Sequence, residues 1–481
     1  MRILMVGSEA VPYAQTGGLA DVLGALPRAL GRLGHEIDVV IPRYRGITAG
    51  AVVAHPSLSG TAAGDRSAVF ATERDQGVRM AFVDQSDFFD REFLYGSGSA
   101  DYPDNAERFA WLSRVALEFA SSEPPYDVVH AHDWQAGLVP VLLRREFSSR
   151  QTFDRVGSVF TIHNLAYQGL FDISWLPRLG LRPDLLSVDA LEYWGRISYL
   201  KGGIVFSDTI TTVSHRYAQE IQTPEFGFGF DGILRSRSAD LVGIVNGIDY
   251  DRWDPERDPH LPAPFSAADL KGKASAKRSV LDELGLPADS GSLERPLVGM
   301  ISRLVDQKGF DLVAALANRL PGLDATFVVL GSGERRYERL FEELAAKHPD
   351  RFGVRIGFDE SLAHRIEGGA DLFLMPSRFE PCGLNQLYSL RYGTVPVVRA
   401  TGGLADTVQN YDPRRGEGTG FCFDDYTPEA LLGTLQTALI VFRDKETWRR
   451  IQEAGMREDH SWDTSAREYE AVYERAGAAN R

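Results

Sequence analysis

A six-residue segment occurs twice in this chain, once in each half. Thr16–Asp21 (TGGLAD) recurs letter for letter as Thr401–Asp406. Each copy follows an apolar run typical of a buried strand and precedes a run with helical spacing. Paired glycines often make only a tight turn. Two copies after two predicted strands instead favour glycine-lined loops that present backbone N–H groups at a helix start and face a shared cleft.

The runs around each copy alternate between strand and helix patterns. Arg2–Val6 and Ile37–Ile41 read as buried strands on either side of a helix, which Pro27 should kink or shorten. The pattern restarts with a strand at Leu297–Ile301 and a helix over Phe310–Leu320. Further strands are expected at Phe327–Leu330, Asp371–Met375 and Val395–Val398. This order predicts an α/β protein with parallel, doubly wound sheets.

The length and the charge narrow the class further. The chain has 481 residues, which favours two domains, and the proline-rich stretch Trp253–Pro264 suits a linker between them. A net charge of −15 disfavours nucleic acid and anionic membranes as partners. Two cysteines, no signal-like segment and no apolar run of membrane-spanning length predict a reduced cytoplasmic protein.

Three strand-end segments carry residues suited to chemistry. Arg303 and Lys308 follow the strand that ends at Ile301, and such a pair can neutralise a diphosphate leaving group, although basic loop residues are usually only solvated. Glu380 precedes Pro-Cys-Gly and can bind sugar hydroxyls or stabilise positive charge at an anomeric carbon; it can equally be an ordinary acid at a helix start. His163 ends the run Val159–Ile162, where it is either a core histidine or a sugar ligand.

The pair His130 and His132 raises a metal hypothesis. On a strand both histidines face the same side, as in metal hydrolases. A catalytic zinc also needs a third ligand, and no second cluster of ligands is evident in the sequence. The residues therefore favour a site without metal.

Several segments together resemble the family of bacterial glycogen synthases and plant starch synthases over nearly the full length. The segments that carry the resemblance are Thr16–Val22, His130–Leu138 (HAHDWQAGL), Thr161–Gly169 (TIHNLAYQG), Val245–Asp249 (VNGID), Ile301–Gly309 (ISRLVDQKG), Ser377–Leu384 (SRFEPCGL) and Tyr392–Asp406. They occur in family order. The resemblance implies the GT-B fold: two Rossmann-like domains, residues 1–245 for the glucan acceptor and 246–457 for the nucleotide-sugar donor. The C-terminal helix, 458–481, is expected to cross back to the first domain.

The same resemblance implies the reaction and its residues. The expected activity is that of an ADP-glucose:α-1,4-glucan 4-α-glucosyltransferase, which retains configuration and uses neither metal nor cofactor. The residues expected to be catalytic are Glu380, His163, Arg303 and Lys308. The substrate-binding positions are Gln15, Gly17, Gly18, Asp21, Asp133, Asn164, Asn246, Phe358, Cys382, Gly383 and Leu384. Many retaining relatives have a second glutamate where this chain has Tyr388, as in the glycogen and starch synthase branch.

One departure from the family pattern concerns the donor. The family usually has lysine before Thr-Gly-Gly, whereas this chain has Gln15, which brings no charge to the phosphates. Three alternatives stay open: transfer from UDP-glucose or to another acceptor, a dinucleotide-dependent oxidoreductase, and a non-catalytic glucan-binding protein. A dinucleotide-dependent oxidoreductase needs a G-x-G-x-x-G motif after the first strand, and this chain has none there. Oligomeric state does not follow from the sequence.

Overall fold

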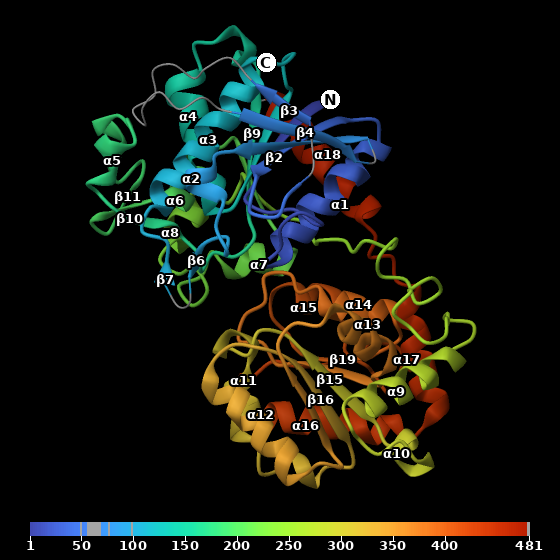
Figure 1. Ribbon diagram of the computed structural model, residues 1–481. Coiled ribbons are helices and arrows are strands. Elements are labelled where there is room, and N and C mark those ends of the chain that lie inside the picture. Colours follow the sequence, from blue (N-terminus) through green and yellow to red (C-terminus); the bar gives the residue numbers. More distant parts are fainter. Residues whose placement is uncertain (49–50, 55–68, 76, 98–99, 479–481) are drawn as a thin grey trace. The chain divides into compact units, whose positions relative to one another are not determined.

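The computed structural model describes residues 1–48, 51–54, 69–75, 77–97 and 100–478 (Figure 1). The chain forms two compact units. The first contains Met1–Val213, Ala218–Gly247 and Trp462–Arg481, and the second contains Ser214–Tyr217 and Ile248–Ser461. Within the described residues, no helix has both the length and the apolar character that crossing a bilayer requires.

A nine-stranded sheet forms the centre of the first unit, in the order β14-β13-β9-β8-β1-β2-β5-β4-β3. The parallel strands are β1 (Arg2–Val6), β2 (Glu36–Pro42), β5 (Val78–Asp84), β8 (Val128–His132), β9 (Gly157–Ile162), β13 (Thr209–Thr212) and β14 (Leu241–Gly243). The edge strands β3 (Ala51–Ala54) and β4 (Val69–Asp75) pair antiparallel. Two small sheets contain β6 (Gly96–Ser97) with β7 (Ala100–Asp101), and β10 (Leu170–Asp172) with β12 (Arg196–Ser198) and β11 (Glu192–Tyr193).

Helices from both ends of the chain cover this sheet. The C-terminal helix α18 (Trp462–Ala478) packs on α1 (Gly18–Arg32) and on β9, so the last segment belongs to the first unit. The others are α2 (Ser86–Phe89), α3 (Asn105–Ser121), α4 (Leu138–Leu142), α5 (Trp175–Arg178), α6 (Tyr199–Phe206), α7 (His215–Glu220) and α8 (Asp231–Ser236). Short turns of helix are η1 (Trp134–Ala136), η2 (Leu143–Phe147), η3 (Gln151–Phe153) and η4 (Pro183–Leu185).

The second unit is built on a six-stranded parallel sheet in the order β17-β16-β15-β18-β19-β20. Its strands are β15 (Leu297–Ile301), β16 (Thr326–Gly331), β17 (Phe352–Ile356), β18 (Leu372–Met375), β19 (Val395–Arg399) and β20 (Phe421–Phe423). Its helices are α9 (Lys271–Glu283), α10 (Ser290–Glu294), α11 (Phe310–Ala315), α12 (Arg335–Lys347), α13 (Glu360–Gly369), α14 (Asn385–Arg391), α15 (Gly402–Thr407), α16 (Pro428–Phe442) and α17 (Lys445–Arg457), with η5 (Asp306–Lys308) and η6 (Leu320–Gly322).

Alternate side chains of β16 enter two different cores. Phe327 and Val329 pack with the α11, α12 and α16 side, whereas Val328 and Leu330 pack with α9 and α13. Because successive strand residues point to opposite faces, helices must cover both faces of this sheet. The structure therefore confirms the predicted doubly wound α/β construction.

Pro27 lies inside α1 and does not shorten it, since the helix continues to Arg32 with its apolar face buried. Two local predictions were wrong. The helix predicted over Phe310–Leu320 ends at Ala315, and the chain turns before η6, where Pro321 has no N–H to continue a helix. Trp253–Pro264 is not a linker: it lies inside the second unit, where the Trp253 ring stacks on Tyr388 at 3.8 Å.

Candidate active site

The carboxyl ends of β8 and β9 bring two predicted residues together in the first unit. Since these strands are parallel neighbours, Asp133 after β8 and His163 after β9 emerge at the same edge. His132 Nδ1 lies 3.0 Å from His163 Nε2, and Asp133 Oδ1 accepts a 2.7 Å hydrogen bond from the His163 backbone N–H. His163 and Asp133 therefore belong to one hydrogen-bonded cluster.

The histidines at this edge are neutral at physiological pH. Burial lowers the pKa of His163 to about 3 and that of His130 to about 3, and it lowers the pKa of His132 well below the ordinary value. A neutral imidazole offers one N–H and one lone pair. His163 is therefore suited to hydrogen bonds with uncharged sugar hydroxyls rather than to pairing with phosphate.

Asp133 combines an unusual backbone with an unusual pKa. Its φ of 55° and ψ of −178° lie in a region that almost only glycine occupies. Burial raises its pKa to about 7, although backbone N–H groups of His163 and Asn164 oppose the shift. Such strain at a strand end is typical of functional positions, because the surrounding structure must hold it in place.

The two asparagines differ in their surroundings. Asn164 Oδ1 accepts a hydrogen bond from the Ala166 N–H at 3.1 Å, which closes a local turn. Asn246 is only 5% exposed, and among the described residues its Oδ1 has no hydrogen-bond partner. A buried carbonyl oxygen without a donor costs folding free energy, so Asn246 Oδ1 has the capacity to accept a hydrogen bond from a bound molecule.

The first copy of the glycine repeat is an exposed loop. Gly17 and Gly18 are exposed, and a Cβ at Gly17 would meet nothing within 4 Å. Gln15 Nε2 donates to Asp21 Oδ2 at 3.1 Å. Glu9 fixes the loop, because its carboxylate accepts hydrogen bonds from the Thr16 backbone N–H and from the Thr16 hydroxyl.

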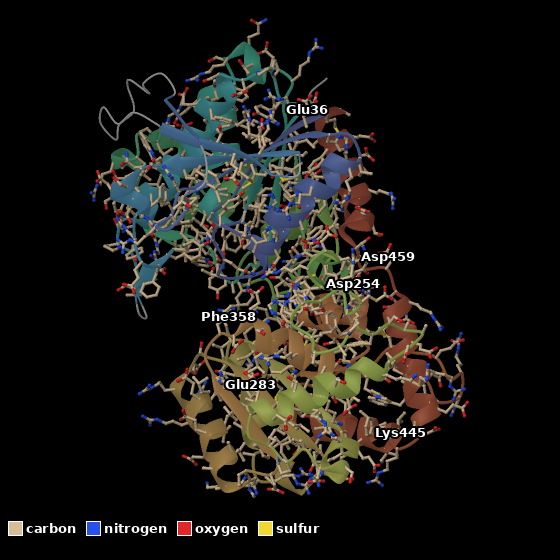
Figure 2. The ribbon with its side chains drawn as sticks, turned by 45° about the vertical axis from the view of Figure 1, so that its right-hand side comes forward. Glu36, Asp254, Glu283, Phe358, Lys445 and Asp459 are labelled. Atoms are coloured by element: carbon tan, nitrogen blue, oxygen red, sulfur yellow. The ribbon has the colours of Figure 1, made fainter. Side chains whose placement is uncertain are left out.

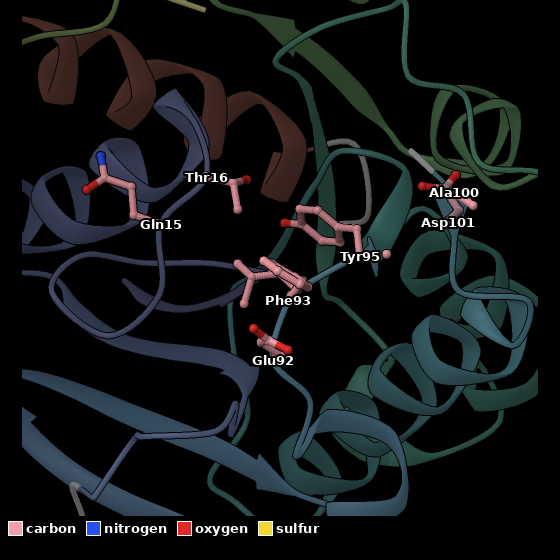
Figure 3. A pocket seen from close by; sticks show the side chains of 9 residues that line it. Gln15, Thr16, Glu92, Phe93, Tyr95, Ala100 and Asp101 are labelled. Carbon is pink, nitrogen blue, oxygen red and sulfur yellow. The ribbon is translucent and has the colours of Figure 1, made fainter. Parts of the chain in front are cut away.

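Sequence reasoning missed Glu9. It is 3% exposed, burial raises its pKa, and the Tyr95 hydroxyl donates to it at 2.5 Å. The available signal was an acid three residues after the end of an apolar strand. Beside this loop lies a hollow of about 470 Å³ (Figure 3), lined by Gln15, Thr16, Glu92, Phe93, Leu94, Tyr95, Gly96, Ala100 and Asp101.

In the second unit Lys308 and Glu380 form a direct pair. Lys308 Nζ donates to Glu380 Oε2 at 2.6 Å, and the Ser377 hydroxyl donates to the same oxygen at 3.0 Å. Glu380 is 5% exposed. The loop with Lys308 can come close to the segment before Glu380 because the next residue is Gly309. This glycine has a φ of 78°, and a Cβ there would lie 2.0 Å from the Pro376 carbonyl oxygen.

Arg303 lies on the same loop as Lys308 but is exposed. Its guanidinium donates a long hydrogen bond of 3.4 Å to Gln307 Oε1. The Gln307 carbonyl in turn accepts from the Arg378 N–H at 2.9 Å, which joins the loop to the segment before Glu380. Lys308 is thus fixed on the carboxylate, whereas Arg303 is an exposed residue of the same loop.

The second glycine copy has a different role, and the prediction of a ligand-facing loop there was wrong. Gly402 and Gly403 are buried, and the Gly403 N–H donates to the Glu380 carbonyl at 3.1 Å. A Cβ at Gly402 would lie 1.9 Å from the Glu380 carbonyl, and one at Gly403 would lie 2.0 Å from that of Cys382. These glycines let the backbone support the Glu380 turn.

The remaining predicted positions surround that turn or stand on another loop. Cys382 is buried, and Gly383 has a φ of 74°. Leu384 precedes α14 as its N-cap. Phe358 is 86% exposed on the loop between β17 and α13 (Figure 2), which is unusual for a phenylalanine and fits a surface for stacking.

Hydrogen bonds to the protein occupy both ring nitrogens of His130, whereas the buried Nε2 of His132 has no hydrogen-bond partner among the described residues. His130 Nδ1 lies 2.9 Å from the Tyr473 hydroxyl, and His130 Nε2 lies 2.6 Å from the Thr161 hydroxyl. His130 and His132 do share a face, with ring centroids 3.9 Å apart. Their role here is to fix α18 and His163.

Family models match most of the chain: one described as the starch synthase catalytic domain over residues 2–236, and glycosyl transferases group 1 over 287–456. A glycogen synthase from Koribacter versatilis is 49% identical, with 99% of this chain and 98% of the relative covered. A glycogen synthase from Anaeromyxobacter dehalogenans is 51% identical, with 98% and 99% covered.

The chain belongs to the glycogen synthase family. Among solved structures, the catalytic domain of starch synthase IV from Arabidopsis thaliana, bound to ADP and acarbose, matches with a TM-score of 0.89. It is 35% identical, and 99% of each chain is covered. The glycogen synthase family membership and the GT-B fold predicted from the resemblance are thereby confirmed. The chain is a glucosyltransferase that makes α-glucan, as its family does.

Proposed function

We propose that this enzyme lengthens an α-1,4-glucan at its non-reducing end with glucose from ADP-glucose, retaining the configuration and using no metal. The observation that carries the proposal is the 2.6 Å contact between Lys308 and Glu380, with Arg303 on the same loop. Two cations and one buried carboxylate suit a substrate with an anionic diphosphate and a sugar that becomes cationic. The 35% identical starch synthase IV structure, bound to ADP, supports the adenine donor.

The bond between the glucose anomeric carbon and the distal phosphate oxygen breaks, and the acceptor 4-hydroxyl oxygen forms the new bond on the same face. The leaving phosphate takes the proton of that hydroxyl, so no second carboxylate is needed. Arg303 and Lys308 stabilise the charge that grows on the phosphate. Glu380 binds sugar hydroxyls and stabilises the cationic carbon. We assign the donor to the second unit, with Phe358 near the base and Cys382, Gly383 and Leu384 at the sugar and phosphates.

Residues of the first unit orient the sugars in this proposal. Neutral His163 hydrogen-bonds the transferred glucose, and Asp133, Asn164 and Asn246 bind its hydroxyls. The exposed loop Gln15–Asp21 binds the distal phosphate through backbone N–H groups, with Gly18 nearest.

The acceptor glucan is assigned to the hollow beside that loop. Phe93 is 50% exposed there, next to Tyr95, and aromatic rings offer apolar surfaces to sugar faces. We place the reaction in the cytoplasm, with glycogen or maltodextrin as its polymeric partner.

The test is nucleotide diphosphate release from ADP-glucose or UDP-glucose with glycogen, in the presence of EDTA. Transfer from ADP-glucose under these conditions is expected. Transfer from UDP-glucose alone would refute the donor, dependence on added metal would refute the metal-free step, and the absence of turnover with both donors would favour a non-catalytic glucan-binding protein.

The residue before the glycine loop gives a second prediction. Gln15 is exposed and carries no charge, so replacement by lysine adds a cation beside the phosphates. Gln15→Lys is expected to raise kcat/KM for ADP-glucose by about tenfold, equivalent to roughly 1.4 kcal/mol. Gln15→Met is the uncharged control. An unchanged kcat/KM with every donor would contradict a role for this position.

A further inference from the structure

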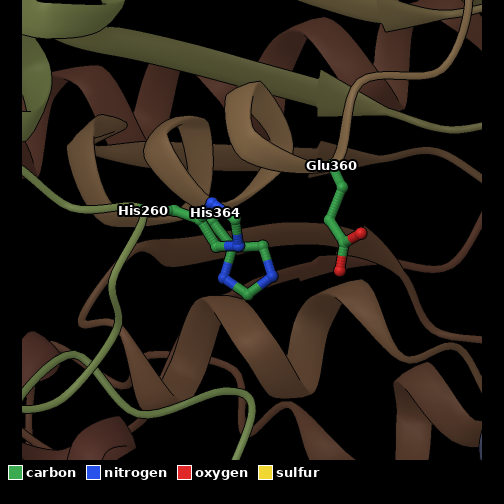
Figure 4. Close-up of side chains that lie close together, drawn as sticks. All are labelled: His260, Glu360 and His364. Atoms are coloured by element: carbon green, nitrogen blue, oxygen red, sulfur yellow. The ribbon is translucent and has the colours of Figure 1, made fainter. Parts of the chain in front are cut away.

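Three side chains of metal-binding type meet in the second unit, outside the residues assigned to glucose transfer. They are His260, Glu360 and His364, whose ligand atoms all lie within 4.8 Å of one another (Figure 4). Glu360 and His364 are four residues apart on α13, so they share one face of that helix. His260 comes from the irregular segment that the sequence had suggested as a linker.

His364 is the most constrained of the three. It is 1% exposed, and its ring lies flat on Trp253 with the centroids 3.7 Å apart. Its Nδ1 lies 2.7 Å from Asp258 Oδ2. A carboxylate accepts and does not donate, so Nδ1 is the donor of this bond and Nε2 is the ring nitrogen left for a ligand. Among the described residues this buried Nε2 has no hydrogen-bond partner.

The carboxylate of Asp258 organises both histidines. Its Oδ1 accepts a 2.8 Å hydrogen bond from the His260 backbone N–H, and its Oδ2 also accepts from the Tyr392 hydroxyl at 2.6 Å. A carboxylate behind a histidine fixes the tautomer and the direction of the ring, as behind the ligands of many metal sites. A buried ring nitrogen with a fixed direction and no hydrogen-bond partner is suited to binding a ligand.

We propose that His260, Glu360 and His364 bind one divalent cation of the zinc class. Two imidazoles and one carboxylate suit zinc and its neighbours, whereas magnesium and calcium prefer oxygen ligands. Three protein ligands leave a fourth position for water. The cation joins the segment around His260 to the first turn of α13, directly after the loop that carries Phe358.

Binding requires a small closure of the cluster. Ligands about 2.1 Å from a tetrahedral zinc lie roughly 3.4 Å from one another, closer than the 4.8 Å limit of this cluster. Glu360 has a side chain that is 42% exposed, and His260 is partly buried, so both can move toward the fixed His364. Arg252 donates to Glu360 Oε1 and competes with the cation for this carboxylate.

The test uses the full chain after removal of metal with EDTA and dialysis. Titration calorimetry with ZnCl₂ is expected to show one ion per chain, and Co²⁺ is expected to give the visible absorption of a tetrahedral site. His260→Ala and Glu360→Gln each weaken zinc binding by at least about tenfold. Arg252→Gln strengthens it, because the competing cation is gone. His348→Ala removes a histidine outside the cluster and leaves binding unchanged.

Two results would overturn the proposal. One is the absence of stoichiometric zinc binding by the stripped chain, which would leave the cluster as an ion pair between Arg252 and Glu360. The other is equal binding by the parent chain, His260→Ala and Glu360→Gln, which would place the ion elsewhere. Each variant retains His364 and its stack on Trp253, so circular dichroism should match the parent. None of these measurements depends on glucose transfer.

Discussion

At the scale of single residues, Asp133 is held in a conformation that its side chain disfavours. The φ of 55° with ψ near 180° is open to glycine and strained for other residues, yet the carboxylate stays bonded to the His163 N–H. The sugar-binding role that we propose for this carboxylate explains why glycine does not occupy the position.

A matched pair of variants separates the strain from the carboxylate. Asp133→Gly and Asp133→Ala both remove the side-chain oxygen, but only the glycine variant relieves the backbone. We expect Asp133→Gly to be more stable than Asp133→Ala by about 1–2 kcal/mol. Both should lose kcat/KM by about tenfold or more, since the carboxylate is gone. Urea unfolding and steady-state kinetics measure these quantities. An alanine variant as stable as the glycine variant would show that no strain is stored.

At the scale of elements, the same six letters build two different turns. Gly17 has open space around it, whereas its counterpart Gly402 has a φ of 46° and lies against the Glu380 carbonyl. Identical local sequence therefore gives an exposed loop before α1 and a buried support beneath Glu380 before α15.

Alanine should destabilise the protein at one of these equivalent positions and have little effect at the other. Gly402→Ala forces the Glu380 turn to move and is expected to destabilise the second unit by about 3 kcal/mol, with loss of transfer. Gly17→Ala, at a φ of −162°, should change the free energy of unfolding by no more than about 0.5 kcal/mol. Thermal unfolding and activity provide the comparison. Equal destabilisation by the two changes would contradict the difference between the loops.

The buried histidines at the ends of β8 and β9 make the first unit sensitive to acid. The unfolded chain binds protons at these histidines as the pH falls below about 6.5, whereas the folded chain resists down to about pH 3. Their contribution is therefore fully present above pH 6.5 and is lost as the pH falls. The raised pKa values of Asp133 and Glu9 act in the opposite direction.

Replacing one of these histidines isolates its contribution. His130→Gln keeps polar contacts with Tyr473 and Thr161 but cannot be protonated. Between pH 6 and 4 the free energy of unfolding of the first unit should fall less steeply in this variant than in the parent. The two slopes should differ by about 1.4 kcal/mol per pH unit, the effect of one histidine. Hydrogen exchange of β8 and β9 amides measures that stability. Parallel pH profiles of the parent and the variant would contradict the prediction.

At the scale of the whole molecule, the last helix completes the first unit. α18 fixes His130 through Tyr473, and Ser465 donates to the Val245 carbonyl at 2.6 Å. Gly157, at the start of β9, lies so close to α18 that a Cβ would meet the Ala476 carbonyl carbon at 2.7 Å.

This close approach gives a test of how far the effect of α18 extends. Gly157→Ala should displace α18 and lower the protection of β8 and β9, while amides of the second unit keep theirs. We expect a loss of about 2 kcal/mol in the first unit. Gly477→Ala is the control, since nothing lies within 4 Å of that Cβ. Hydrogen exchange with mass spectrometry measures the protection of each unit separately. Loss of protection in the second unit as well would contradict the prediction that the effect stays within the first unit.

The sequence by itself determined the parallel α/β elements, because apolar runs and helical spacing depend on neighbouring residues. β15 was predicted with its observed bounds, and the strand ends placed His163, Arg303, Lys308 and Glu380 at sheet edges. The motif resemblance determined the family in the same way, since identity along the chain is local information.

Only the tertiary structure decided what each residue touches. The burial of Gly402, the lone Nε2 of His364 and the support from Glu9 depend on contacts between residues far apart in the sequence. Trp253–Pro264 shows the reason clearly: prolines and polar residues made it resemble a linker. Stacking of Trp253 on His364 and the bonds of Asp258 instead fix it inside the second unit. Composition reports local preference, whereas burial and partners are set by packing.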